Sequence, residues 1–263
     1  MLVRVKFHGT RGSVLQPNNT VRYGGHTSCY EVVTDEFQII LDTGTGFQDV
    51  TIDPDRITII LYSHFHHDHI QGLPFNFGIF SQSDDIHIAS SLAQKSALRT
   101  LIQTYFSGGY FPIDVVVMLK HLKFSNFSSI KKLMASSSVL ETFELNHPGG
   151  SMGYSIEGDD RKMAYLLDNE YKPDQLEGLL KFVDGANCVL WDGMFTESEL
   201  EYRAGWGHSS MEEACKFAER ANIDRLVITH HSPGRTDDEL DALGQSLTSS
   251  KVSFAIQARE LEF

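Results

Sequence analysis

Four histidines and an aspartate lie within six residues of this chain. Residues 64–69 read His-Phe-His-His-Asp-His and directly follow the short apolar run 57–62. The β-branched character of that run predicts a buried strand, so the cluster lies where a strand gives way to a loop. Neutral imidazole and carboxylate are the usual ligands of a borderline divalent metal such as zinc. A histidine tag would lie at a terminus and lack the aspartate, so the pattern favours a metal site.

Three further polar residues follow apolar runs later in the chain. His147 comes after 140–145, Asp168 after 163–167, and His230 after 226–229. Any one of them alone would be read as a capping aspartate or a histidine at a turn. Two metal ions need more ligands than one loop supplies, and strand-end loops can direct several side chains to one point. Together with residues 64–69, the three residues indicate a two-metal centre.

This arrangement resembles the metallo-β-lactamase superfamily, in its HxHxDH signature and in the order of the later ligands. The resemblance implies an α/β fold, an αββα four-layer sandwich with the metals at one edge. It also implies how the ligands divide. The first metal would be held by His64, His66 and His147. The second would be held by Asp68, His69 and His230. Asp168 and a hydroxide would bridge the two, and His67 would be a spacer residue.

Other segments resemble the phosphodiesterase branch of the superfamily, which is ribonuclease Z-like and cyclic-nucleotide phosphodiesterase-like. They are residues 9–13, 23–29 and 41–46. Residues 207–214 resemble the loop in which ribonuclease Z carries a histidine that assists the leaving group, which here is His208. Relatives commonly carry Asn where this chain has His26.

The resemblance implies a metal-dependent hydrolase, a phosphoric diester hydrolase acting on a small phosphodiester, with a cyclic nucleotide as one candidate. A metal-bridging hydroxide would attack phosphorus, and His208 would protonate the leaving group. Asp68 and His208 are the expected catalytic residues. The expected cofactors are two divalent ions per chain, with Zn²⁺ favoured and Mn²⁺ or Fe²⁺ also compatible. Substrate contacts or supporting roles are expected for Arg11, His26, Asp42, Phe75 and His231.

The apolar periodicity predicts alternating strands and helices. Strands are expected at 2–7, 28–34, 37–42, 57–62, 138–145, 152–157, 162–167, 186–191, 225–229 and 252–256. Helices are expected at 90–104, 174–181, 209–221 and 236–247, the third opened by a capping pattern from Ser209 to Glu212. With no linker or repeat visible, residues 1–263 are expected to form a single domain. The segment 105–127 is rich in Phe and Tyr, and lid, interface and core remain open for it.

Composition narrows the expected partners and location. The net charge is −13, and a protein that grips a long polyanion normally carries a basic face, so no DNA or long RNA is expected. His147 and Asp168 are 21 residues apart, which leaves no room for the long arm that ribonuclease Z usually inserts there. No apolar run approaches a membrane span, so no membrane association is expected. The three cysteines include no CxxC pair, which favours a reducing cytoplasmic location. A homodimer is possible.

Three other functions share parts of this pattern. Hydrolysis of a lactone, thioester or β-lactam would use the same metal site without needing His208. An iron-dependent sulfur dioxygenase uses a similar histidine motif and usually dispenses with a full second metal site. A metal-stabilised sensor or binding module would leave the same ligands in place without turnover.

Overall fold

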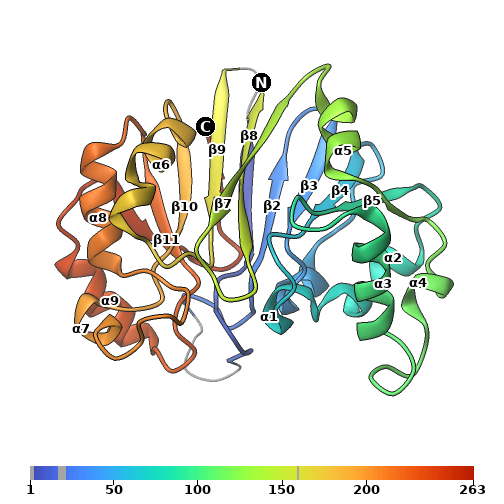
Figure 1. Ribbon diagram of the computed structural model, residues 1–263, viewed down its shortest axis with the longest axis horizontal. Helices are drawn as coiled ribbons and strands as arrows, with labels where there is room; N and C mark the ends of the chain where they lie inside the picture. Colours follow the sequence, from blue (N-terminus) through green and yellow to red (C-terminus); the bar gives the residue numbers. More distant parts are fainter. Residues whose placement is uncertain (1–2, 17–21, 159) are drawn as a thin grey trace.

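Two β-sheets pack face to face, with helices on both outer faces (Figure 1). The computed structural model describes residues 3–16, 22–158 and 160–263. Within these ranges the first sheet has the order β13 (Glu260–Glu262), β1 (Arg4–Gly9), β2 (Cys29–Val33), β3 (Phe37–Leu41), β4 (Ile57–Leu61), β5 (Ile86–Ala89) and β6 (Leu122–Phe124). The second has the order β12 (Val252–Phe254), β11 (Leu226–Thr229), β10 (Cys188–Asp192), β9 (Arg161–Leu166), β8 (Ser151–Gly158) and β7 (Val139–Leu145).

The helices divide between the two sheets, as Figure 1 shows. The first half of the chain supplies α1 (His67–Ile70), α2 (Phe77–Phe80), α3 (Lys95–Tyr105), α4 (Val115–Met118) and α5 (Phe127–Met134). The second half supplies α6 (Leu176–Phe182), α7 (Glu197–Leu200), α8 (Met211–Arg220) and α9 (Asp237–Ser246). Short 3₁₀ helices lie at Thr45–Asp49, Leu73–Phe75 and Pro173–Gln175. The predicted αββα four-layer α/β sandwich is confirmed.

Separate apolar clusters fill the space between the two sheets and the space between each sheet and its helices. Side chains from both sheets, such as Ile39 of β3 and Tyr165 of β9, form the core between the sheets. A second cluster packs the first sheet against α3 and α4, and a third packs the other sheet against α6, α8 and α9. Because the central strands are covered on both faces, they are continuous apolar runs; all five residues of β3 are buried.

Parallel strands bring the predicted site residues to one edge. Strands β3, β4, β5 and β6 run parallel in the first sheet, and β9, β10, β11 and β12 run parallel in the second. The carboxyl ends of parallel neighbours lie at the same edge of their sheet, which is where loops gather functional side chains. Residues that follow β3, β4, β9 and β11 are therefore placed close together.

Three buried tyrosine hydroxyls connect the two sheets. Tyr30 of β2 bonds Thr229 of β11 at 2.7 Å. Tyr154 of β8 donates to the carbonyl of Tyr62, beyond β4, at 2.8 Å and accepts the N–H of Ser91 at 3.0 Å. A third hydroxyl, on β9, reaches the metal edge and is described below. Since an unbonded buried hydroxyl is costly, these bonds fix how one sheet lies on the other.

The predicted strands and helices have counterparts within a few residues, except where short elements were missed. Residue 2 of the first predicted strand lies outside the described residues. The helix predicted from residue 90 begins at Lys95. Strands β5, β6 and β13 were not predicted, because three or four residues carry little periodicity of their own. Within the described residues, no helix is both long and apolar enough to cross a membrane.

Two sequence interpretations are resolved at this level. The capping box of α8 is formed by Ser210 and Glu213, one residue later than predicted, because Ser209 instead donates its hydroxyl to the carbonyl of Asn169. The aromatic segment 105–127 contributes mainly to the outer core of the first sheet, with buried residues that include Phe106, Val115, Leu119, Leu122 and Phe124.

We predict that Tyr154→Phe lowers the free energy of unfolding by about 1–3 kcal/mol, because it leaves the Ser91 N–H and the Tyr62 carbonyl without the hydroxyl. Urea unfolding followed by circular dichroism measures the change. Tyr110→Phe is the matched control, since Tyr110 is 80% exposed. Equal stability of the two variants would contradict the bridging role.

Candidate metal centre

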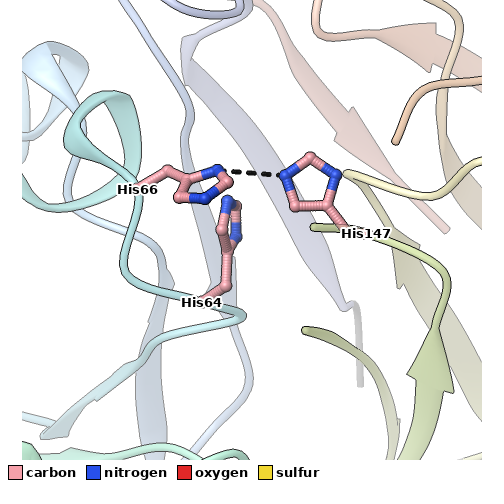
Figure 2. A group of neighbouring side chains, drawn as sticks. All are labelled: His64, His66 and His147. Carbon is pink, nitrogen blue, oxygen red and sulfur yellow. Dashed lines mark hydrogen bonds between the residues drawn. The ribbon is translucent and has the colours of Figure 1, made fainter. Parts of the chain in front are cut away.

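Histidines and aspartates from both sheets converge at the edge described above. One group comprises His64, His66 and His147, shown in Figure 2. Another comprises Asp68, His69 and His230. Within each group, one ligand atom per residue lies within 4.8 Å of the others. These are the two triads expected from the sequence.

Asp168 lies between the two triads. Its Oδ1 is 3.8 Å from Nε2 of His64 and 3.6 Å from Nε2 of His147. The same oxygen is 3.5 Å from Nε2 of His230, and Oδ2 is 3.0 Å from Nε2 of His69. One carboxylate therefore reaches both triads, which is the position a bridging ligand needs.

Hydrogen bonds on the far side of the rings set their orientation. Nδ1 of His69 bonds Oδ2 of Asp42 at 2.7 Å, and Nδ1 of His147 donates to the carbonyl of Gly207 at 2.8 Å. Nδ1 of His230 lies 3.0 Å from the hydroxyl of Ser28. Bonding Nδ1 in this way turns Nε2 towards the centre as the metal-binding nitrogen, as in known histidine–metal sites. Nε2 of His147 lies 3.0 Å from Nδ1 of His66, the contact drawn in Figure 2.

The donor set fits divalent metal ions. Nε2 of His64 is buried and makes no hydrogen bond, although its Nδ1 lies 3.0 Å from the hydroxyl of Ser63. A buried polar atom without a partner is costly and calls for an explanation such as an ion. Neutral imidazole nitrogens with carboxylate oxygens are the ligands that zinc and similar ions prefer.

Three residues of the site adopt left-handed backbone conformations. Asp42, Asp168 and His230 have φ angles of 61°, 57° and 59°. Each comes one or two residues after a parallel strand. This conformation costs a non-glycine residue roughly 1–2 kcal/mol, and such residues cluster at functional sites. The turn takes each chain sharply out of its strand, at the edge where the side chains meet.

The cluster is electrostatically coupled. Burial would raise the pKa of Asp168, but the nearby rings of His230, His69 and His64 outweigh it and hold that pKa well below its usual range. Burial opposes protonation of His69, yet the carboxylates of Asp168, Asp68 and Asp42 raise its pKa well above 6.5. Burial lowers the pKa of His64, leaving its ring neutral. The centre therefore keeps its carboxylate charged, as metal binding requires.

The glycine-rich segment near the N-terminus packs directly on the second triad. The N–H of Ser13 donates to Oδ2 of Asp68 at 2.6 Å. A Cβ on Gly12 would lie 2.4 Å from Nε2 of His230, so only glycine fits there. Segment 9–13, singled out in the sequence, thus supports metal ligands with its backbone.

Asp42 is a buried junction behind the first metal loop. Its carboxylate accepts the N–H and hydroxyl of Ser63 at 2.8 and 2.7 Å, and the hydroxyl of Tyr165 at 2.6 Å, besides the bond to His69. Tyr165 belongs to β9, so this is the third hydroxyl that joins the sheets. Asp42 touches ligands without belonging to either triad, as expected for a supporting residue.

His208 lies against the centre with an acidic partner of its own. Its Nδ1 is 2.7 Å from Oδ2 of Asp192 and 3.9 Å from Oδ1 of Asp168, and its ring stacks on that of His230 with centroids 5.2 Å apart. Burial opposes protonation, but Asp192 and then Asp168 raise the pKa of His208 to about 9. The pair can hold a proton beside the metal ligands.

Sequence reasoning missed Asp192, although a signal was present. It is the last residue of β10, which lies between β9 and β11 in the sheet. The neighbouring strands β9 and β11 lead to Asp168 and His230. An aspartate at the end of β10 therefore had the same strand-end context as the predicted ligands.

The remaining predicted residues lie outside the two triads. Arg11 is fully buried and donates to the carbonyls of Gly24, Ser232 and Arg235, a placement that favours a structural role. His231 is also fully buried and hydrogen-bonds the carbonyl of Ala255; burial lowers its pKa to about 3.

His26 and Phe75 have other neighbours as well. The His26 ring contacts the hydroxyl of Thr45 and the amide of Gln48. Phe75 is 54% exposed, and its ring packs edge-on against Phe111. Their contacts with substrate stay predictions.

Two neighbouring triads of His and Asp, one buried and one partly exposed, thus lie at the edge of an αββα sandwich. The chain matches the family model described as "Beta-lactamase superfamily domain" over residues 38–231, more than half of its length, and it belongs to this superfamily.

Individual relatives are similar over most of the chain. A "Ribonuclease Z" of Ignicoccus hospitalis is 26% identical over 73% of this chain and 78% of its own length. The metallo-β-lactamase fold protein YhfI from Bacillus subtilis superposes with a TM-score of 0.76 at 19% identity, covering 100% of this chain and 99% of that one. Zn²⁺-bound PqqB from Methylobacterium extorquens gives a TM-score of 0.71 at 15% identity, with 99% and 100% covered. The two structures support the fold alone.

We predict that Asp42→Asn weakens metal binding about 10- to 100-fold, because the carboxylate that orients His69 and Ser63 is lost. Competition with a chromophoric chelator measures the affinity. Asp35→Asn, at an exposed carboxylate on the turn after β2, is the control. Unchanged affinity in Asp42→Asn would show that Asp42 does not support the ligands.

Proposed function

We propose that this protein is a dinuclear-metal phosphodiesterase acting on a small phosphodiester, a cyclic nucleotide being one candidate. One observation carries the proposal: the Asp168 carboxylate lies between two complete ligand triads and within 3.9 Å of His208. The nuclease name of the Ignicoccus relative supports phosphodiester chemistry. Hydrolysis of a phosphodiester needs positive charge beside the phosphate, an activated water and a proton donor.

Each proposed metal ion has its own set of candidate ligands. The first metal would be held by His64, His66 and His147, the second by Asp68, His69 and His230, with Asp168 shared. When bound, the two ions would supply Lewis acidity towards the phosphate and lower the pKa of a coordinated water. The fixed rings and carboxylates hold these positions without reorganisation during the reaction.

His208 is the proposed proton donor to the departing oxygen. Asp192 holds its Nδ1, which leaves Nε2 as the nitrogen that gives up its proton. The imidazolium is stabilised by Asp192 and Asp168, so a donor exists at neutral pH. Asp68 is the other proposed catalytic residue. It accepts a hydrogen bond from the backbone N–H of Ser13, and this bond joins the N-terminal segment to the second triad.

The first experiment pairs elemental analysis with turnover of bis(p-nitrophenyl) phosphate, with zinc, manganese or iron(II) added to metal-free protein. We expect about two ions per chain, with zinc the favoured metal, and hydrolysis that depends on them. Two bound ions with no phosphodiester turnover would contradict the proposal and favour lactone, thioester or β-lactam substrates. A single iron would favour the dioxygenase alternative, and full occupancy with no hydrolase activity would favour a binding module.

His208→Ala should lower turnover by roughly 10²–10⁴, the usual contribution of a general acid, with metal content unchanged. The residue belongs to neither triad, although His208 also forms a possible ligand group with His147 and Asp168. Loss of metal in His208→Ala would therefore show that it is a ligand and not only a proton donor. His87→Ala is the control, since His87 lies on β5 away from the ligand groups. Full activity in His208→Ala would overturn the assignment.

Asp192→Asn should move the alkaline limb of the pH–rate profile to lower pH. The raised pKa of His208 depends most on Asp192 among its charged partners, and the protonated donor is lost as the pH rises through that pKa. Removing the negative charge lowers the pKa, so activity falls off earlier than in the unaltered protein. A profile that does not shift would show that Asp192 does not set the donor's protonation.

A second candidate substrate is RNA. A cavity of about 560 Å³ on the first sheet's outer side is lined partly by Lys95, Arg99, Lys120 and Lys123. Three of these four cations, all but Lys123, form no ion pair with any described residue. This concentrated basic surface was not foreseen from the net charge of −13. The name of the Ignicoccus relative points the same way and conflicts with the expectation of no long RNA.

Cleavage and inhibition assays with structured RNA distinguish a small phosphodiester from RNA as the substrate. For a small-substrate enzyme, structured RNA should be neither cleaved nor an effective inhibitor at low salt. Metal-dependent cleavage of RNA that weakens in a Lys95→Gln, Lys120→Gln variant would favour RNA instead.

We further propose that residues 1–263 act as one domain, because strands from both ends of the chain, β1 and β13, pair, and both halves supply ligands. The cytoplasmic location and the possible homodimer stay predictions.

A further inference from the structure

The loop before His208, residues 201–207, is fastened to the metal centre, and we call it the rim loop. The carboxylate of Glu170, two residues after Asp168, accepts the N–H groups of Gly205 and Gly207 at 2.7 and 3.1 Å. The carbonyl of Gly207 holds the ring of His147. A Cβ on Gly207 would lie 2.2 Å from Nδ1 of that ring, so the backbone of the loop packs directly against His147.

Trp206 is held at the outer end of a short series of rings that starts at His208. The Phe195 ring lies 5.8 Å from His208 and 6.3 Å from Trp206, edge-on in both cases. The guanidinium of Arg203 lies 4.9 Å from the Phe195 ring and 5.9 Å from the Trp206 ring, and it donates to the carbonyl of Glu199. Trp206 nevertheless remains 60% exposed. The indole is thus positioned by its neighbours and still open to a ligand.

The rim loop lies on the side where the leaving group must be. If His208 protonates the departing oxygen, the group attached to that oxygen extends past His208. Next to His208 lie the buried ring of Phe195 and then the exposed ring of Trp206, with the half-buried Arg203 beside both. Arg203 forms no ion pair with any described residue. Aromatic rings bind nucleobases by stacking without choosing among them, and a guanidinium adds attraction for the base or its phosphates.

We propose that the leaving group is a nucleoside whose base stacks on Trp206, so that the substrate class is a nucleotide phosphodiester. The inference rests on the proposed phosphodiesterase function and adds the chemistry of one substrate half. It assigns to Trp206 a substrate contact of the kind that the sequence suggested for Phe75. Phe75 follows the metal loop on the first sheet's side, and its ring packs on Phe111 with no contact to His208.

The experiment compares binding of adenosine 5′-monophosphate and ribose 5-phosphate to the metal-loaded protein by calorimetry. Both carry the same phosphate for the metal centre, and only the first carries a base. Stacking on one aromatic ring changes affinity by about 5- to 150-fold, so the nucleotide should bind tighter by a factor in that range. Trp206→Ala should remove the difference, and Trp206→Phe should retain most of it.

Tyr202→Ala is the matched control, since Tyr202 is in the same loop and 82% exposed. It should leave the difference intact. Fluorescence gives a second readout, because the chain has two tryptophans and Trp191 is only 1% exposed. The nucleotide should quench the emission of the unaltered protein and not that of Trp206→Phe, whose remaining indole is buried.

Equal binding of the two phosphates would overturn the inference, as would a difference that survives in Trp206→Ala or is lost in Tyr202→Ala. These outcomes are separable from failure of the proposed function. If bis(p-nitrophenyl) phosphate is hydrolysed while the base adds no affinity, the inference alone fails. If no phosphodiester is hydrolysed, the proposed function fails whatever the calorimetry shows.

Discussion

The buried carboxylate of Asp42 fastens the metal edge to the rest of the fold. It is fully buried and receives hydrogen bonds from Ser63, His69 and Tyr165. A buried carboxylate is tolerated only when its oxygens are satisfied, so the groups that satisfy it are held in place. Those groups are the start of the first metal loop, a ring of the second triad and a strand of the opposite sheet. Separating any one of them would remove a hydrogen bond from this buried carboxylate.

The site also depends on where the parallel strands end. Both sheets present the carboxyl ends of their parallel strands at the metal edge, and the chain turns sharply there through left-handed residues. Strain of roughly 1–2 kcal/mol at each of Asp42, Asp168 and His230 is offset by the bonds those side chains make. Rings that are fixed at Nδ1 present Nε2 to the centre, so the chain's own hydrogen bonds orient these nitrogens.

Much of this arrangement was predictable from sequence because its signals are local. An apolar strand followed at once by a histidine or aspartate marks both the end of an element and a possible ligand, and residues 64–69 repeat the pattern in one loop. The short strands β5, β6 and β13 escaped prediction because their stability comes from the strands beside them. The helix α5 likewise packs against β5 and β7, contacts that no periodicity reveals.

Supporting roles were harder to assign because they depend on packing across the chain. Arg11 was expected to contact substrate or support the site, and its guanidinium is enclosed by carbonyls from segments more than 200 residues away. Asp192 carried the same strand-end signal as the ligands, but only the order of strands in the sheet shows that it lies between Asp168 and His230. Sequence thus indicates which residues are candidate ligands, and the fold determines which of them meet.

In the proposed function, the rim loop would couple substrate selection to metal binding. Gly207 supplies the carbonyl that orients His147, and its neighbour Trp206 is the exposed ring that we place against the leaving group. Because Glu170 fixes the loop from the other side, the indole cannot be moved far without disturbing a ligand of the first triad. The net charge of the chain does not reveal where individual charges lie relative to the rim loop. Although the chain is strongly acidic, cations without an ion pair to any described residue lie at particular places, including Arg203 beside the rim and Lys95 and Lys120 of the outer cavity. For the proposed function, the position of charge relative to the candidate metal centre, and not its sum, would decide which substrates can approach.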